Sequence, residues 1–242
     1  MTLQPQTLQA EWFSKRFGDV AALDGASFSA KTGEVLGVIG PNGAGKSTLF
    51  ECVAGVLPAD AGIVKLGDVA VNLDARKDAL FFLPDAISPW PDQRVAWVLE
   101  FVERVFDSKS GVRPDARADV IASLALVPLL DKRVGELSKG QRKRVAVSIG
   151  LITPQPFLLL DEPFDVLDLR QSREVEAVLR AHAARGRGLV LSIHQLADAA
   201  RLCDRLALLS SGKSVGEGTL EELRLKAGVA GGNIEEVFLA LT

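Results

Sequence analysis

The chain has 242 residues, of which 48% are hydrophobic and 24% charged, and its net charge is −3. This length allows one substantial core, with or without a smaller lobe, and the charge excludes a general basic field for nucleic acid. No run reaches the ~18 apolar residues of a spanning helix, and no secretory signal or disulfide framework is visible, so we expect a cytoplasmic protein.

The first part of the chain is predicted to consist mainly of strands around one helix. A turn around Phe17-Gly18-Asp19 joins the first two strands, and a continuous apolar run predicts that the third is a buried parallel strand. A helix is expected at 46–54, where Gly55 provides a stop. The strands are expected at residues 8–13, 26–30, 35–39, 62–66 and 80–83.

The middle of the chain is predicted to be helix-rich, and strands and helices alternate after it. The three middle helices are expected at 93–106, at 114–125 with Pro114 at the start, and from about Ser138 onward. The later elements are expected as strands at 157–160, 189–193 and 205–209 and as helices at 168–184 and 195–203. Two short helices, opened by Thr219-x-x-Glu222 and Asn233-x-x-Glu236, close the chain.

This alternation predicts an α/β fold with a mainly parallel sheet and helices on both faces. We expect a single domain over residues 1–242. Its core would comprise 1–86 and 153–223, interrupted by an inserted helical subdomain at 87–152 and followed by a helical tail at 224–242.

Residues 40–48 read GPNGAGKST and fit the phosphate-loop pattern GxxxxGK(S/T). A glycine-rich turn before a helix is the ordinary alternative, but the order of buried strand, loop and helix is the one that phosphate binding requires. Lys46 would bring positive charge to the outer phosphates, and Ser47 would offer a hydroxyl to Mg²⁺. The nucleotide-binding residues predicted in this loop are Gly40, Pro41, Asn42, Gly43, Ala44, Gly45, Lys46, Ser47 and Thr48.

A second candidate site follows the apolar run at 157–160, which ends in Asp161 and Glu162. Ligands bind at the carboxyl ends of strands in open parallel sheets. We therefore expect Asp161 to face the Mg²⁺ held by Ser47, and Glu162 to act on the attacking water. An acidic N-cap of a helix would account for one of these carboxylates, but poorly for both.

Residues 137–141 read LSKGQ before an amphipathic helix, and the acidic strand follows soon afterwards. With these motifs in this order, the chain resembles the ATP-binding subunit of ATP-binding-cassette (ABC) transporters from about residue 7 to 223. LSKGQ resembles the LSGGQ signature of that family. The resemblance implies a phosphate-loop NTPase core with an N-terminal antiparallel β region, an inserted helical subdomain and ATPase activity with ATP and Mg²⁺.

The resemblance also implies roles for single residues. Phe17 would stack on adenine, Asp161 would support Mg²⁺, and Glu162, His194 and Lys46 would be catalytic. A second copy would complete each site in a homodimer that sandwiches two ATP molecules. The residues implied to bind ATP across that interface, or to lie in it, are Ser138, Lys139, Gly140, Gln141 and Asp168.

Three positions depart from the pattern. Asp85 stands where the family has a glutamine that ligates Mg²⁺, and we expect it either to ligate the metal or to be a turn residue after Pro84. Lys139 replaces a glycine of the signature, and it would either help to bind ATP or point to solvent. Val166 stands where the family often has glycine and would stiffen the loop.

The resemblance implies a separate transmembrane permease subunit, no nucleic-acid partner and a place on the cytoplasmic face of a membrane. Segment 88–106 would be the docking surface, with Trp90 and Trp97 as candidate contacts, although Trp97 could also belong to the core. The tail is similar to those of stand-alone ATPases of ABC-2-type exporters. A soluble ABC ATPase and a nucleotide-gated module with weak hydrolysis remain alternatives. The basic run 142–144 is interpreted as a solvated helix face.

Overall fold

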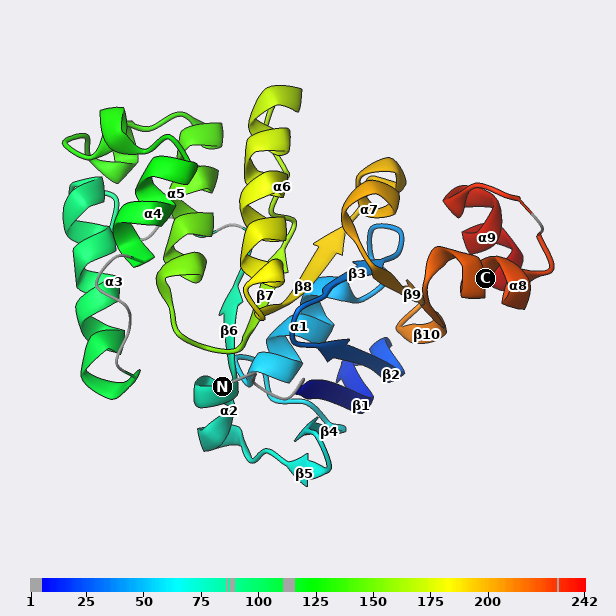
Figure 1. The fold of residues 1–242 in the computed structure, drawn as a ribbon. Coiled ribbons are helices and arrows are strands. Elements are labelled where there is room, and N and C mark those ends of the chain that lie inside the picture. The colour runs from blue at the N-terminus through cyan, green and yellow to red at the C-terminus, as the bar shows by residue number, and fades with distance from the viewer. Residues whose placement is uncertain (1–5, 86, 88–89, 111–115, 230) are drawn as a thin grey trace.

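The computed structural model describes residues 6–85, 87, 90–110, 116–229 and 231–242. These residues form two sheets with helices around them (Figure 1). The smaller sheet has the strand order β2-β1-β4-β5, and the larger sheet has the order β10-β9-β3-β8-β7-β6. The predicted α/β fold, with a mainly parallel sheet and an N-terminal antiparallel region, is confirmed.

The smaller sheet is antiparallel and comes mostly from the N-terminal hairpin. β1 (Thr7–Phe17) pairs with β2 (Val20–Lys31) on one side and with β4 (Ala61–Leu66) on the other, and β5 (Val69–Ala70) pairs with β4. The two predicted N-terminal strands are confirmed, and both are longer than predicted. The end of β1 was missed because Ser14, Lys15 and Arg16 are polar, and the start of β2 was missed because Asp24 and Gly25 interrupt its apolar pattern.

The larger sheet carries five parallel strands and one antiparallel edge strand. Its central strand β3 lies between β8 and β9, so the loop that follows β3 emerges in the middle of the carboxyl edge. The strands of this sheet are β3 (Val35–Ile39), β6 (Leu80–Leu83), β7 (Phe157–Asp161), β8 (Gly188–Ile193), β9 (Arg205–Ser210) and β10 (Lys213–Gly218).

The core lies on both faces of the larger sheet. Successive side chains of a strand point to opposite faces, so Leu36 and Val38 pack with Phe50 between this sheet and the smaller one. Val35 and Ile39 belong to the cluster on the other face, beneath the later helices. A strand buried on both faces accounts for the continuous apolar run that predicted β3.

The predicted helices are confirmed in the described residues, apart from the start of the second middle helix, since Pro114 lies outside those residues. Ser138, Thr219 and Asn233 each form a capping box with the residue three positions later, which satisfies backbone N–H groups at the helix start. The helices are α1 (Lys46–Ala54), α2 (Leu73–Ala79), α3 (Val95–Ser110), α4 (Ala116–Ser123), α5 (Lys139–Ile152), α6 (Leu169–Ala184), α7 (Leu196–Leu202), α8 (Leu220–Ala227) and α9 (Ile234–Leu241).

Among the α-helices and strands of the described residues, α2, β5 and β10 were not predicted. α2 reads LDARKDA, in which polar residues dominate, and its start depends on the side chain of Asn72, which accepts a hydrogen bond from the N–H of Ala75. β10 reads KSVGEG, and two glycines and two charges disfavour a strand in isolation. The hydrogen bonds to β9 at the sheet edge stabilise β10 as a strand, although its own residues do not favour one.

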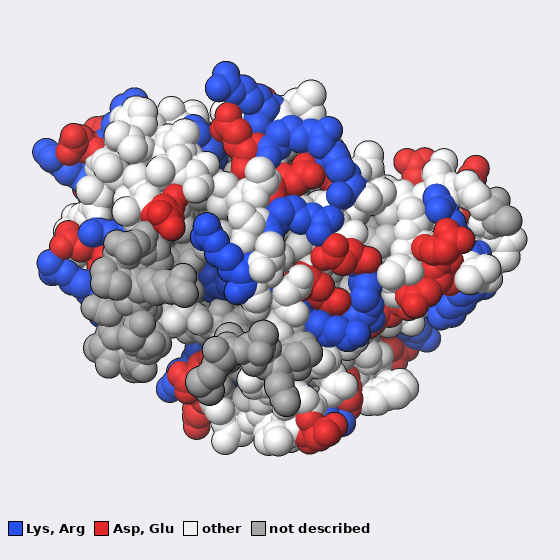
Figure 2. All heavy atoms as spheres, in the orientation of Figure 1, with Lys and Arg blue, Asp and Glu red and all other residues white. Residues whose placement is uncertain are grey.

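The helices α3, α4 and α5 lie together beyond the β6 edge of the sheet, and α8 and α9 lie at the opposite end (Figure 1). The domain boundaries proposed from the sequence remain a prediction. Within the described residues, no helix combines the length and apolar character needed to cross a membrane. On the face seen in Figure 2, positive and negative side chains are interspersed, so this face offers no continuous basic surface.

Candidate functional site

The loop between β3 and α1 turns sharply through two glycines with left-handed backbone. Gly43 has a φ of +80° and Gly45 a φ of +100°, and Gly45 caps α1. A Cβ on Gly45 would lie 2.5 Å from the carbonyl oxygen of Ala22, so no other residue fits there without a shift of backbone. Nothing lies within 4 Å of the position of a Cβ on Gly43, so the loop is open on this side, and glycines of this kind let backbone N–H groups approach an anion.

Lys46, the first residue of α1, is folded back onto this loop. Its side chain is buried, and Nζ donates hydrogen bonds to the carbonyl oxygens of Gly40 at 2.8 Å and Pro41 at 3.2 Å. Burial lowers the pKa of Lys46, and the negative charges of Glu162 and Asp161 partly oppose this effect. Two carbonyl oxygens therefore hold the ammonium at the loop, and the negative charges of Glu162 and Asp161 favour its charged form.

A cavity of about 340 Å³ lies over the loop, and Glu162, which comes much later in the sequence, after β7, also lines it. Its donors, one lysine, glycine backbone and the N-terminus of a nine-residue helix, fit a phosphate group. Ser47 contributes a hydroxyl, and carboxylate and hydroxyl oxygens are suitable ligands for Mg²⁺. The residues that line the cavity are Ala22, Asn42, Gly43, Gly45, Lys46, Ser47, Thr48 and Glu162.

Asp161 and Glu162 end β7 and share one buried hydroxyl. Ser192 on β8 pairs with Asp161 across the parallel strands, and its Oγ donates to Asp161 Oδ1. The same Oγ accepts a hydrogen bond from the N–H of Glu162 at 2.9 Å. Sequence reasoning missed Ser192, although its place two residues before His194, at the end of an apolar strand, was an available signal.

His194, also predicted to be catalytic, lies beside Glu162, and the catalytic roles of both remain a prediction. His194 Nδ1 lies 3.6 Å from Glu162 Oε2, and both line a small recess beside the end of β8. Glu162 itself has a φ of +47°, an uncommon backbone conformation for a residue with a side chain. Its carboxylate therefore projects from a sharp turn at the carboxyl edge of the sheet.

Asp85 follows β6 and is bound by a lysine. Lys143 on α5 donates to Asp85 Oδ1 at 2.5 Å and to the carbonyl oxygen of Glu162 at 3.1 Å. The Lys143 side chain is only 7% exposed, so the interpretation of residues 142–144 as a solvated helix face is wrong for this residue. Asp85, Glu162 and Asp165 place carboxylate oxygens within 4.8 Å of one another. Asp85 is thus an ion-pair partner beside Glu162, and its role as a metal ligand remains a prediction.

The LSKGQ segment forms the N-terminus of α5. The Ser138 side chain accepts a hydrogen bond from the N–H of Gln141, and Gln141 Oε1 accepts from the N–H of Ser138. A Cβ on Gly140 would lie 2.6 Å from Gln171 Oε1, so the packing of α5 against the start of α6 requires glycine. Among the described residues that line the phosphate cavity, none belongs to 138–141. The segment therefore lies apart from the phosphate loop of its own chain.

Lys139 and Phe17, both predicted to bind ATP, are exposed. Lys139 lines a second cavity, of about 310 Å³, together with Asp85, Lys143 and Val166. Phe17 ends β1 with 51% of its surface exposed, and Lys15 Nζ lies 5.6 Å from the centre of its ring. Asp168 is the N-cap of α6, where its Oδ1 accepts a hydrogen bond from the N–H of Gln171 at 2.8 Å.

Val166 adopts a strained backbone in the loop between Glu162 and α6. Its φ is +61°, a left-handed conformation that costs an L-residue about 1–2 kcal/mol. We expect Val166→Gly to raise the free energy of unfolding by about 1 kcal/mol, because the strain removed exceeds the added chain entropy. Urea unfolding measures the change. The control Val69→Gly, at an exposed strand position, should lose about 1 kcal/mol; equal losses in both variants would contradict the prediction.

Comparison with known proteins gives one consistent result. The sequence profile of the family described as ABC transporter matches residues 23–165. Nod factor export ATP-binding protein I of Burkholderia orbicola is 34% identical over 206 residues, which are 84% of this chain and 68% of that protein. An uncharacterized ABC transporter ATP-binding protein of Methanocaldococcus jannaschii is 30% identical over 220 residues, covering 89% of this chain and 79% of that protein.

Solved structures share the fold over nearly the whole chain. The structure of an ATP-binding subunit of an ABC transporter has a TM-score of 0.86 and 24% identity, and covers 97% of this chain and 98% of the other. The ADP conformation of an ATP-binding cassette of an ABC transporter has a TM-score of 0.78 and 25% identity, with the same coverage. Together with the sequence profile and the relatives, these likenesses place the chain in the ABC transporter family, as an ATP-binding subunit that hydrolyses ATP.

Proposed function

We propose that this ATPase powers export of a substrate across a membrane through a separate transmembrane subunit. The observation that supports this most directly is the similarity, over 84% of the chain, to a Nod factor export ATP-binding protein. The chemical nature of the cargo would be read by the membrane subunit. The ATPase would then lie on the cytoplasmic face of that membrane, bound to its partner.

We assign the hydrolytic roles to the residues around the phosphate cavity. Glu162 would accept the proton of the attacking water, and His194, at 3.6 Å from it, would help to orient the γ-phosphate. Lys46 would leave the loop carbonyls for the outer phosphates. When bound, Mg²⁺ would neutralise charge on the phosphate oxygens. Its ligands would come from Ser47, Asp161 and Asp85, although Asp85 must first give up part of its contact with Lys143.

The separation of LSKGQ from the phosphate cavity supports a head-to-tail homodimer in which each copy completes the site of the other. Ser138, Lys139 and Gly140 would then reach the γ-phosphate held by the second copy. Two apolar side chains near this segment are uncovered in the single chain, Val166 at 46% and Leu169 at 74% exposure. Burial of these side chains in a dimer would remove them from water.

An aromatic cluster on and before α3 is the proposed docking surface for the membrane subunit. Its members are Trp90, Trp97 and Phe101, which are 43%, 42% and 38% exposed. Trp97 and Phe101 stack with ring centroids 5.1 Å apart, and Trp90 meets Phe101 edge-on at 5.2 Å. Partly exposed aromatic rings that hold one another in place are typical of interface anchors. Ser88, at the start of the predicted docking segment, lies outside the described residues.

The combined replacement of Trp97 and Phe101 by alanine is expected to release the ATPase from its membrane partner. Affinity isolation from detergent-solubilised native membranes should recover a transmembrane protein with the wild-type chain and at least about tenfold less with the double variant. Leu225→Ala, which removes a side chain 76% exposed on α8, is the control and should retain the partner. Recovery with ribosomes in place of a membrane protein would contradict the proposed function.

A further inference from the structure

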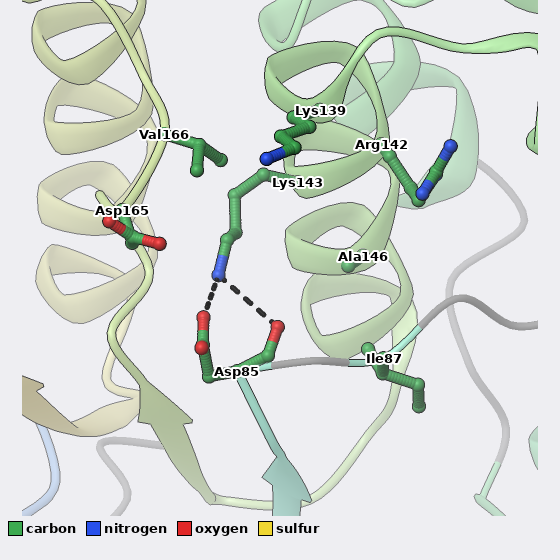
Figure 3. A pocket seen from close by; sticks show the side chains of 8 residues that line it. All are labelled: Asp85, Ile87, Lys139, Arg142, Lys143, Ala146, Asp165 and Val166. Carbon is green, nitrogen blue, oxygen red and sulfur yellow. Dashed lines mark hydrogen bonds and ion pairs between the residues drawn. The ribbon is translucent and has the colours of Figure 1, made fainter.

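One buried ammonium group joins three segments beside the candidate site. Lys143 extends from α5 into the space between the end of β6 and the turn after β7 (Figure 3). Its Nζ donates to Asp85 Oδ1 at 2.5 Å, to the Asp85 carbonyl oxygen at 3.3 Å and to the Glu162 carbonyl oxygen at 3.1 Å. The helical region and the carboxyl edge of the sheet therefore meet at this side chain.

The bonding of this ammonium leaves it little freedom. A buried cation is unfavourable unless it is paired and hydrogen-bonded, and Lys143 is 7% exposed. An ammonium has three N–H donors, and three acceptors surround this one. Removal of any acceptor would leave a donor unmatched in a poorly hydrated place, so the position of Lys143 and that of its partners depend on one another.

The Glu162 backbone is held on both sides. Its N–H donates to Ser192 Oγ at 2.9 Å, and its carbonyl oxygen accepts from Lys143 and also from the N–H of Asp165 at 3.1 Å. This support stabilises a residue whose φ of +47° is unfavourable for a side chain. The direction in which the Glu162 carboxylate leaves the chain follows from this backbone geometry, so the groups that hold the peptides also aim the carboxylate.

We propose that Lys143 is a positioning residue that aims Glu162 and couples α5 to the catalytic edge of the sheet. Asp85 holds the ammonium in place, and the ammonium holds the Glu162 carbonyl. A movement of α5 relative to the sheet would then move Lys143, and with it the backbone that positions Glu162. This inference rests on the proposed role of Glu162 as the base that activates water.

The test is Lys143→Met, which keeps an unbranched side chain that is one atom shorter and removes its donors. We expect kcat for ATP hydrolysis to fall by about 30- to 100-fold, because a misplacement of about 1 Å costs on this scale. The dissociation constant for ATP, measured by calorimetry, should change by less than about threefold, since the phosphate loop is untouched. Lys143→Arg keeps donors and charge and should recover at least about a third of the wild-type kcat.

A second readout needs no nucleotide. Hydrogen exchange of the Asp165 and Leu167 amides, which close the turn after Glu162, should become at least about tenfold faster in Lys143→Met. In Asp85→Asn the side-chain oxygen can still accept from Lys143 but the charge pair is lost, so exchange there should become faster than in wild type and stay slower than in Lys143→Met. Lys132→Met makes the same replacement at an exposed lysine and should change neither kcat nor exchange.

Unchanged exchange in a folded Lys143→Met variant overturns the inference, whatever happens to kcat. If that variant does not fold, Lys143→Gln replaces it with the same expectations, because its shorter amide cannot reach both Asp85 and the Glu162 carbonyl. A failure of the proposed catalytic roles gives a different pattern. The Glu162→Gln variant would then hydrolyse ATP at the wild-type rate, while the exchange results for Lys143 would still stand.

Discussion

Glu162→Gln is expected to lower kcat for ATP hydrolysis by about 10²- to 10⁴-fold, the usual contribution of a general base. The amide keeps the size of the side chain but cannot accept the proton of water. Glu162 projects from a turn held by Ser192 and Lys143, and these contacts involve its backbone, so the variant should keep its fold. Steady-state release of phosphate with Mg²⁺ and ATP measures the loss.

The same variant should trap the ATP-bound dimer. If ATP joins two copies and hydrolysis separates them, slow hydrolysis should give a species of twice the 25.8 kDa chain mass in light scattering with Mg²⁺ and ATP, and a monomer with ADP. Glu174→Gln, at a half-buried carboxylate of α6 that pairs with Arg170, is the matched control and should hydrolyse ATP at the wild-type rate. Normal turnover by Glu162→Gln would show that another group activates the water, and a monomer with ATP would contradict the sandwich.

The central part of the fold could be predicted because its signals are local. Within about twenty residues the sequence has an apolar run for β3, the glycines of the phosphate loop and an apolar helix, and each of these elements can be recognised from its own residues. Asp161 and Glu162 follow β7 for the same reason, and strand order in a parallel sheet brings them to the loop. Ser138 and Thr219 indicate helix starts because each forms a capping box with a residue three positions later.

The parts that the sequence did not reveal depend on contacts between distant segments. Lys143 lies in a basic run that looks solvated, and only the packing of α5 against the end of β6 buries it next to Asp85, 58 positions away. β10 has too many glycines and charges to be recognised, and it is ordered by β9. Val166 shows its strained backbone only in three dimensions, because nothing in its neighbours requires a positive φ.

Asp85 illustrates why a resemblance alone leaves a residue's role open. Its position in the chain favoured a metal ligand or a turn residue, and the structure gives it a third role, as the partner of a buried lysine. A carboxylate that already neutralises an ammonium is a poorer ligand for a cation, because the two positive charges compete for the same oxygens. Asp85 can take part in binding Mg²⁺ only to the extent that Lys143 shares it.

Lys46→Ala is expected to weaken ATP binding by about 10- to 100-fold and to lower hydrolysis by at least about 10²- to 10³-fold, because charge-assisted hydrogen bonds to the phosphates are lost. Lys46 already lies in the loop, where two carbonyl oxygens hold its ammonium in place. The ammonium would exchange these carbonyls for phosphate oxygens without leaving the loop, so little ordering of the side chain is needed when phosphate binds. Calorimetric titration with ATP and the phosphate-release assay measure the two effects.

Lys77→Ala, at an exposed lysine on α2, is the control for the loss of one positive charge, and it should bind and hydrolyse ATP as the wild type does. The comparison distinguishes the loss of the Lys46 contacts from a change in the overall charge of the protein, because both variants lose one positive charge. A Lys46→Ala variant that keeps wild-type affinity would mean that the glycine backbone and the helix N-terminus alone hold the phosphates. In that case the buried ammonium would serve only to stabilise the loop through its two carbonyl contacts, and its loss should appear as a lower melting temperature with hydrolysis intact.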